Sequence, residues 1–179
     1  MLSFFSRRRV MRTYSGVTPR DLMRCLDFAT LHHGTSPDKA GIQVILHPVR
    51  VATRMLVDGL PLAMVCAGYL HDVLKDTGAT PSDMRRANIP SSVVDAVVCL
   101  TRVGDEPYEQ YLDGVAMNRI AAIVKMYDMI DNSVRISPPR SEEVIARGLA
   151  RAEYLMRAVR VNYPRFFIEW PSRKSIYPW

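Results

Sequence analysis

The chain has 179 residues, of which 48% are hydrophobic, and a formal net charge of +6. A chain of this length can bury a core as one globular domain, and this composition argues against wholesale disorder. It has no CxxC pair and only three cysteines, Cys25, Cys66 and Cys99, which we expect to be small core residues. So few cysteines argue against a disulfide or zinc-thiolate framework and predict a reducing, cytoplasmic compartment. No run of 18 apolar residues occurs, and no apolar segment follows the early basic run, so we expect neither a membrane span nor a secretory signal.

The first predicted helix begins after Thr18. A threonine N-cap, Pro19 at the first helical position and Asp21 at the third together form a helix start signal. Apolar residues follow at roughly helical spacing, and the helix is expected to end near Gly34. Residues 34–46, punctuated by glycine and proline, are expected to be irregular.

Two further helices are predicted over residues 47–59 and 61–76. The first of them carries a single apolar stripe. The second is apolar nearly all round until it reaches His71, which is typical of a central, buried helix.

The second half of the chain is also expected to be helical. Thr80 repeats the start signal for a short helix, and a longer helix begins at Pro90. After a loop over residues 102–107, the pattern predicts a helix over 107–136 with a break at Gly114.

A last helix is expected after Ser141, and no segment of the sequence alternates convincingly with period two. The sequence therefore predicts an all-α fold. We divide the chain into a basic N-terminal arm (1–16), one helical domain (17–163) and an aromatic C-terminal tail (164–179).

The candidate chemistry centres on His71 and Asp72. This ionisable pair lies at the polar end of an otherwise apolar helix, where burial is costly unless a cation or a partner charge compensates. Imidazole and carboxylate are good ligands for divalent cations, but a satisfied polar contact is the alternative interpretation of the pair taken alone.

Two further segments strengthen the case for a cation site. His47 opens a helix just before a proline, and Asp128 lies in the middle of a largely apolar helix. Lys125 and Asn132 are three and four residues from Asp128, so all three are expected to share one helix face. A lysine beside a metal-bound aspartate would suit a phosphate anion.

In order and spacing, these motifs resemble the hydrolase domain of the RelA/SpoT family, most closely its small single-domain alarmone hydrolases. The resemblance covers about residues 22–135. The matching segments are His32-His33-Gly34-Thr35, Lys39 with Gly41, His47-Pro48, Leu70-His71-Asp72-Val73-Leu74-Lys75-Asp76, and Lys125-Met126-Tyr127-Asp128 with Asn132.

The resemblance implies a compact HD-domain helical bundle that binds one divalent metal ion, usually Mn²⁺. Its metal ligands would be His47, His71, Asp72 and Asp128. It also implies removal of pyrophosphate from the 3′ position of guanosine tetra- or pentaphosphate. Lys39, Lys125 and Asn132 match positions expected to contact the substrate, and Asp76 matches the second acid of the family's ED pair.

Lys75 departs from the family pattern, because the first acid of the ED pair is a lysine here. Lys75 could bind a substrate phosphate while Asp76 or Asp131 orients the water. The substrate could instead differ from the family's, or the site could bind a nucleotide without hydrolysing it. His32 and His33 are expected to be structural residues at a helix end rather than ligands.

Other functions are also compatible with these residues. A different HD enzyme, acting on a deoxynucleoside triphosphate or a nucleoside monophosphate, would use the same ligands. A nucleotide-binding regulator, or a nucleic-acid-binding protein that uses the basic arm, is the alternative of another class. An arginine arm without interleaved aromatic residues is weak support for nucleic acid. We therefore expect a phosphorylated nucleotide as the partner, no membrane, and a homo-oligomer as an open alternative.

Overall fold

The computed structural model of the protein describes residues 16–35, 37, 41–134 and 141–164. These residues form helices, and the one β-type pairing among them is an isolated bridge between Pro37 and Gln43. The predicted all-α fold is therefore confirmed.

Helix α2 (Pro19–His33) begins as the sequence predicts. The Thr18 hydroxyl accepts a hydrogen bond from the Asp21 amide, and the Asp21 carboxylate accepts one from the Thr18 amide. The same reciprocal pair of hydrogen bonds, called a capping box, joins Thr80 and Asp83 at the start of the short α6 (Pro81–Arg86). Each box satisfies amide groups that a helix start otherwise leaves unpaired.

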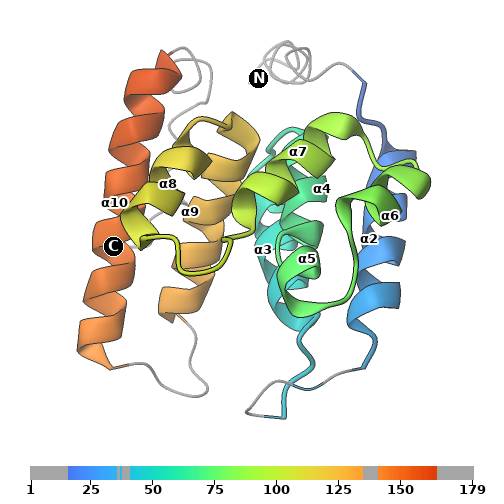
Figure 1. The fold of residues 1–179 in the computed structure, drawn as a ribbon, viewed down its shortest axis with the longest axis horizontal. Helices are drawn as coiled ribbons and strands as arrows, with labels where there is room; N and C mark the ends of the chain where they lie inside the picture. Colours follow the sequence, from blue (N-terminus) through green and yellow to red (C-terminus); the bar gives the residue numbers. More distant parts are fainter. Residues whose placement is uncertain (1–15, 36, 38–40, 135–140, 165–179) are drawn as a thin grey trace, which may run out of the picture.

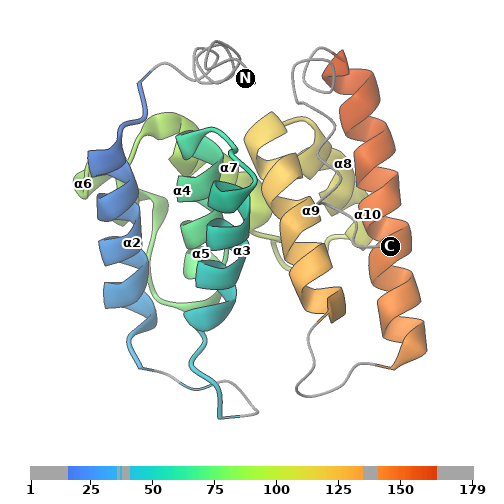
Figure 2. The same ribbon diagram turned by 180° about the vertical axis from the view of Figure 1, so that it is seen from behind.

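Helix α4 (Leu62–Leu70) is the centre of the molecule (Figure 1). It packs against α2, α3 (Leu46–Val57), α7 (Ser91–Leu100) and α9 (Arg119–Val134). The view from behind shows α3 lying alongside α4 (Figure 2). Close approach of these two helices needs Gly68, since a Cβ there would lie 3.0 Å from Met55 Sδ and 3.3 Å from Ala52 Cα.

The predicted helix over 61–76 is interrupted at His71 and Asp72, so that expectation was wrong in one respect. Helix α4 ends at Leu70, and a separate single turn, α5 (Val73–Asp76), follows. Asp72 has φ −102° and ψ −5°, which departs from helical geometry. On a continuous helix, consecutive side chains point about 100° apart, whereas the interruption lets these two face one site.

The predicted break at Gly114 was also misplaced. Gly114 lies inside α8 (Tyr108–Ala116), and the chain turns at Met117 and Asn118 before α9 begins. The Asn118 side chain accepts a hydrogen bond from the Ala121 amide. The start of α9 is therefore capped by asparagine, a residue favoured at that position.

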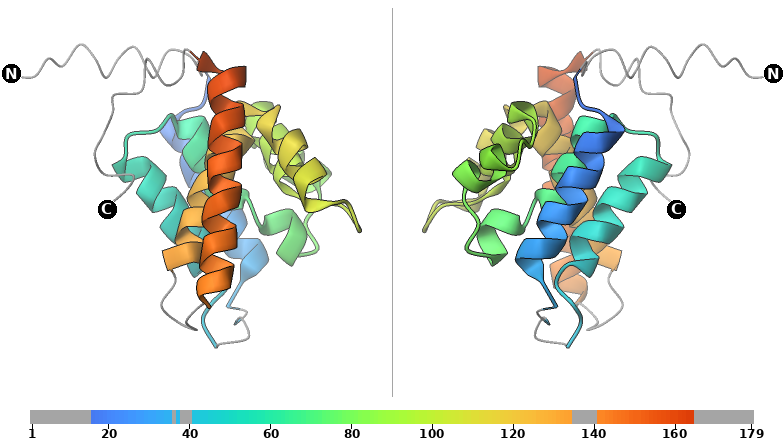
Figure 3. Two further views of the ribbon diagram at one scale, coloured as in Figure 1. Left: turned by 90° about the vertical axis from the view of Figure 1, so that its left-hand side faces the viewer. Right: turned by 90° about the vertical axis from the view of Figure 1, so that its right-hand side faces the viewer.

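Helix α10 (Glu142–Asn162) runs along α9 and also contacts α8 (Figure 3). It begins at the predicted place, since the Ser141 hydroxyl accepts from the Val144 amide. The predicted arm and tail lie outside the described residues except for Gly16 and Pro164.

Of the cysteines expected in the core, Cys25 and Cys66 are buried, and Cys99 is partly exposed. Within the described part of the chain, no helix combines the length and apolarity that a membrane crossing requires.

Candidate cation site

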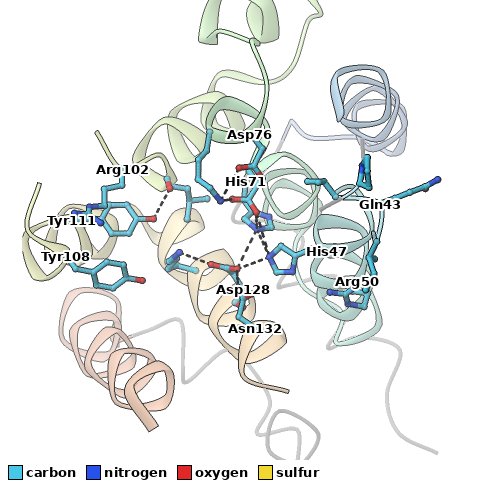
Figure 4. Close-up of a pocket in the computed structure, with 17 residues that line it drawn as sticks. Gln43, His47, Arg50, His71, Asp76, Arg102, Tyr108, Tyr111, Asp128 and Asn132 are labelled. Atoms are coloured by element: carbon cyan, nitrogen blue, oxygen red, sulfur yellow. Dashed lines mark hydrogen bonds and ion pairs between the residues drawn. The ribbon is translucent and has the colours of Figure 1, made fainter. Parts of the chain in front are cut away.

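A cavity of about 730 Å³ opens where α3, α5, α8 and α9 meet (Figure 4). Its lining includes all four predicted metal ligands, His47, His71, Asp72 and Asp128. These residues come from α3, the turn between α4 and α5, and α9. The interruption of the central helix thus lies at the base of the cavity.

Two imidazoles face each other across this base. His47 Nε2 and His71 Nε2 are 3.3 Å apart. His71 is 3% exposed, and its Nδ1 lies 2.8 Å from the carbonyl oxygen of Gly68. Because a carbonyl only accepts, His71 Nδ1 must carry a proton, and Nε2 is the nitrogen presented to the site.

Two carboxylates converge on the same imidazole nitrogens. Asp72 Oδ2 lies 3.3 Å from His71 Nε2 and 3.8 Å from His47 Nε2. Asp128 Oδ1 lies 2.9 Å from His47 Nε2 and 3.7 Å from His71 Nε2. One ligand atom from each of His47, His71 and Asp72 falls within 4.8 Å of the others, and Asp128 is in hydrogen-bond contact with this group. The structure therefore brings together all four side chains that the sequence pattern selected.

In this cluster, negatively charged carboxylates lie largely shielded from solvent, and they shift the pKa values of the neighbouring histidines. Burial alone would lower the pKa of His71, but the charge of Asp72 and the contact with Asp128 raise it to about 10. Burial opposes ionisation of Asp128, yet Lys125 and the two histidines keep its pKa well below the ordinary value. Both histidines are stabilised in their charged form, which indicates a site suited to positive charge.

The donor set fits a divalent cation. Two imidazole nitrogens and two carboxylate oxygens, borne by three separate parts of the chain, match the ligand preferences of first-row divalent ions. A cation would also compensate the buried carboxylate of Asp128 and the partly buried carboxylate of Asp72, whose removal from water is costly.

Lys75 and Asp76 lie at one edge of the cavity. Lys75 Nζ is 2.7 Å from Asp72 Oδ1 and 3.4 Å from Asp76 Oδ1. The lysine thus binds the Asp72 oxygen that faces away from the histidines. Its side chain is 59% exposed, so the ammonium group is open to solvent and to a ligand.

Lys125 and Asn132 both hold Asp128, as their shared helix face predicted. Lys125 Nζ donates to Asp128 Oδ2 at 2.7 Å, and Asn132 Nδ2 donates to Asp128 Oδ1 at 2.5 Å. Both residues also line the cavity, where they are accessible to a bound molecule.

The remaining candidates are not among the described residues that line the main cavity. Lys39 is outside the described residues. Asp131 is not among the described residues that line the main cavity, because its carboxylate lies behind His47, 2.7 Å from Nδ1. His32 contacts the ring of Phe28, and His33 is buried, with no hydrogen-bond partner for Nε2 among the described residues. Neither of these two histidines is among the described residues that line the cavity, and their expected structural role stays a prediction.

Sequence reasoning missed the wall opposite α3. Arg102, Tyr108 and Tyr111 line the main cavity there. A smaller adjoining cavity of about 380 Å³ adds Arg147 and Arg151 from α10. Arg151 lies over the Tyr108 ring, 3.8 Å from its centroid. The spacing of the two tyrosines was a usable signal, since residues three apart at a helix start share a face.

No family model matches the chain, but individual relatives do. It is 27% identical over 145 residues to a probable guanosine-3′,5′-bis(diphosphate) 3′-pyrophosphohydrolase of Mycoplasma pneumoniae, a match that covers 70% of this chain and 20% of that protein. It is 27% identical over 120 residues to a guanosine-3′,5′-bis(diphosphate) 3′-pyrophosphohydrolase of Aquifex aeolicus, covering 63% and 17%. A GTP pyrophosphokinase of Streptomyces coelicolor is 28% identical over 123 residues, covering 64% and 14%. The chain thus spans a fifth or less of the length of these relatives.

One solved structure has a similar fold over almost its whole length. It is that of a metazoan ortholog of SpoT that hydrolyses ppGpp, with a TM-score of 0.64 and 20% sequence identity. The match covers 87% of this chain and 94% of that one. These similarities confirm the HD-domain fold and the resemblance to RelA/SpoT-type hydrolases that the motifs predicted.

Proposed function

We propose that this HD-type domain is a metal-dependent nucleotide hydrolase that removes the 3′-pyrophosphate of guanosine tetra- or pentaphosphate. The main observation in support of this proposal is that His47, His71, Asp72 and Asp128 converge at the base of a cavity large enough for a nucleotide. The names of the Mycoplasma and Aquifex relatives support the choice of substrate.

A bound divalent cation, with Mn²⁺ as our expectation, would supply phosphate charge neutralisation and an acidified water molecule. The four ligand residues would hold it, and the chain's other residues would handle the substrate. Of the two acids considered for orienting the water, we assign Asp76, because it lines the cavity. Asp131 is directed at the far side of the His47 ring.

The basic wall supports a substrate with several phosphate groups. Lys75, Lys125 and Arg102 line the cavity, and Arg147 and Arg151 lie in the adjoining one. Ammonium and guanidinium groups bind phosphate oxygens through charge-assisted hydrogen bonds. We assign Lys75 and Lys125 to phosphate groups and Asn132 to a polar group of the nucleotide, with Lys39 as a further phosphate contact.

The names of the relatives do not show whether this chain degrades or synthesises the nucleotide, because one of the relatives is a pyrophosphokinase. Each relative is also much longer than the segment that matches this chain. The site chemistry favours hydrolysis, because two imidazoles and two carboxylates form a compact set suited to activating water.

A second candidate rests on Lys75. A lysine where the RelA/SpoT pattern has an acid is consistent with another phosphorylated nucleotide as substrate, or with nucleotide binding without turnover. Direct comparison of substrates separates these functions.

The test is a hydrolysis assay with the purified chain, Mn²⁺ and a panel of nucleotides that includes guanosine tetraphosphate, deoxynucleoside triphosphates and nucleoside monophosphates. We expect guanosine tetraphosphate to release pyrophosphate. His71→Ala or Asp72→Asn should abolish this release, because each removes a ligand from the cation site. Asp95→Asn, on the exposed face of α7, is the matched control and should keep full activity.

Hydrolysis that persists in His71→Ala would show that the chemistry lies at another site. Turnover of a different nucleotide, with guanosine tetraphosphate left intact, would replace the proposed substrate with the second candidate. A cytoplasmic location remains a prediction beside this proposal, and a homo-oligomer remains an open alternative.

A further inference from the structure

Asp131 lies between a surface arginine and a ligand of the cation site. Its Oδ2 is 2.7 Å from His47 Nδ1, the ring nitrogen that faces away from the other three ligands. The opposite ring nitrogen, Nε2, contacts Asp128 and His71. Asp131 therefore contacts the imidazole from behind, outside the main cavity as described.

Arg50 fixes the orientation of this carboxylate. Arg50 Nε donates to Asp131 Oδ1 at 3.1 Å, and a terminal guanidinium nitrogen donates to Oδ2 at 2.8 Å. Such a two-pronged pair constrains the plane of the carboxylate as well as its position. The two residues come from α3 and α9, so their pairing also joins the two helices that carry His47 and Asp128.

The contact determines which nitrogen of His47 can coordinate a cation. An ionised carboxylate only accepts hydrogen bonds, so the proton of the neutral imidazole is held on Nδ1. The lone pair is then on Nε2, directed at the place where the other ligands converge. Carboxylates that accept from the second nitrogen of a ligating histidine fix its tautomer and raise its basicity.

From this geometry we infer that Asp131, held by Arg50, is a positioning residue that increases the affinity of the site for its divalent cation by fixing the orientation and tautomer of His47. This inference depends on the cation site but not on which nucleotide is hydrolysed. From the sequence alone, Asp131 was a candidate for orienting the attacking water, which is a different role.

The test is calorimetric titration of Mn²⁺ into the metal-stripped chain without nucleotide. Asp131→Asn should weaken Mn²⁺ binding by about 10–100-fold, the usual effect of losing such an outer carboxylate. The amide cannot satisfy both neighbours. Either its NH₂ faces the donors of Arg50, or it donates to His47 Nδ1 and moves the imidazole proton to Nε2.

Arg50→Gln should weaken binding less, and the double variant should bind as Asp131→Asn does, because Arg50 acts through Asp131. The control is Arg54→Gln, one turn further along α3, where the arginine contacts Asp58 instead. Its Mn²⁺ affinity should equal that of the unaltered chain. Thermal unfolding of each metal-stripped variant separates a loss of affinity from a loss of fold.

Equal Mn²⁺ affinity in Asp131→Asn and the unaltered chain would overturn the inference, even if the chain hydrolyses guanosine tetraphosphate. Weaker Mn²⁺ binding in a folded Asp131→Asn would support it, even if no nucleotide in the panel is hydrolysed. If Asp131→Asn fails to fold, Arg50→Gln provides the test. A folded Arg50→Gln variant with unchanged affinity would then count against the inference.

Discussion

Lys75 places a cation beside the carboxylate of a candidate metal ligand. Its ammonium group lies 2.7 Å from Asp72 Oδ1, and the other oxygen, Oδ2, faces the histidines. The lysine and a metal ion could therefore use different oxygens of the same carboxylate. This arrangement favours a working site over one that the lysine has destroyed.

Reversing the charge at this position tests the role of Lys75. If the ammonium group binds a substrate phosphate, Lys75→Glu should lower kcat/KM on guanosine tetraphosphate by about tenfold or more, the scale for losing a charged hydrogen bond. Lys75→Met, which removes the charge without reversing it, should have a smaller effect. Both are measured as pyrophosphate release at fixed Mn²⁺.

The opposite outcome is equally informative. If the lysine is a lesion, Lys75→Glu should restore a missing general base and raise hydrolysis by at least about 10²-fold. Such a gain from an inactive parent would favour a nucleotide-binding protein that has lost its activity.

Sequence reasoning could select the four candidate ligands because each lies in a short motif with its own local context. His71-Asp72 follows an apolar helix, and Lys125, Asp128 and Asn132 share a helix face. The contact of Asp131 with His47 could not be predicted in this way, because it joins residues 84 positions apart. A carboxylate one turn along a helix looks the same in sequence whether it faces solvent or an imidazole.

At the scale of elements, helix starts were predicted more accurately than helix interruptions. The boxes at Thr18 and Thr80 are local patterns and were found at the expected positions. The turn at His71 and Asp72 contains neither glycine nor proline, so composition gave no signal for it. At the other interruption, glycine was a misleading signal, because the chain turns at Asn118 while Gly114 remains helical.

The capping box of α2 allows a pH prediction. Hydrogen bonds from Thr18, assisted by the charge of Arg24, hold the pKa of Asp21 below its ordinary value of 3.8. A depressed folded-state pKa stabilises the fold above about pH 4, and this contribution is lost as the pH falls through the folded-state pKa.

Asp21→Asn should therefore lower the free energy of unfolding at pH 7 by about 0.5 kcal/mol, allowing for solvent screening. The difference from the unaltered chain should begin to shrink near pH 4 and vanish as the pH falls through the lowered pKa of Asp21 in the folded state. Urea unfolding at several pH values measures it, with Asp95→Asn as the control for removing an exposed helix carboxylate. A difference that stays constant down to pH 3 would contradict a role for the ionised carboxylate.

At the scale of the whole molecule, the candidate cation site joins parts of the chain that are distant in sequence. His47 is on α3, His71 and Asp72 follow α4, and Asp128 is on α9, while α4 packs against both α3 and α9. Binding at this junction requires the helices to be assembled. A cation should therefore bind the folded chain much more tightly than the unfolded chain and stabilise the whole domain.

Mn²⁺ at about 100 times its dissociation constant should stabilise the fold by about 2.7 kcal/mol, because it binds the folded state preferentially. For a chain of this size, that corresponds to a rise in Tm of about 5–10 °C. Thermal unfolding of the metal-stripped chain, with and without Mn²⁺ and with excess chelator, measures the shift. His71→Ala should unfold at the same temperature with and without Mn²⁺, because one buried ligand is missing. An undiminished shift in that variant would mean that Mn²⁺ stabilises the protein from another place, and the four convergent side chains would then need another explanation.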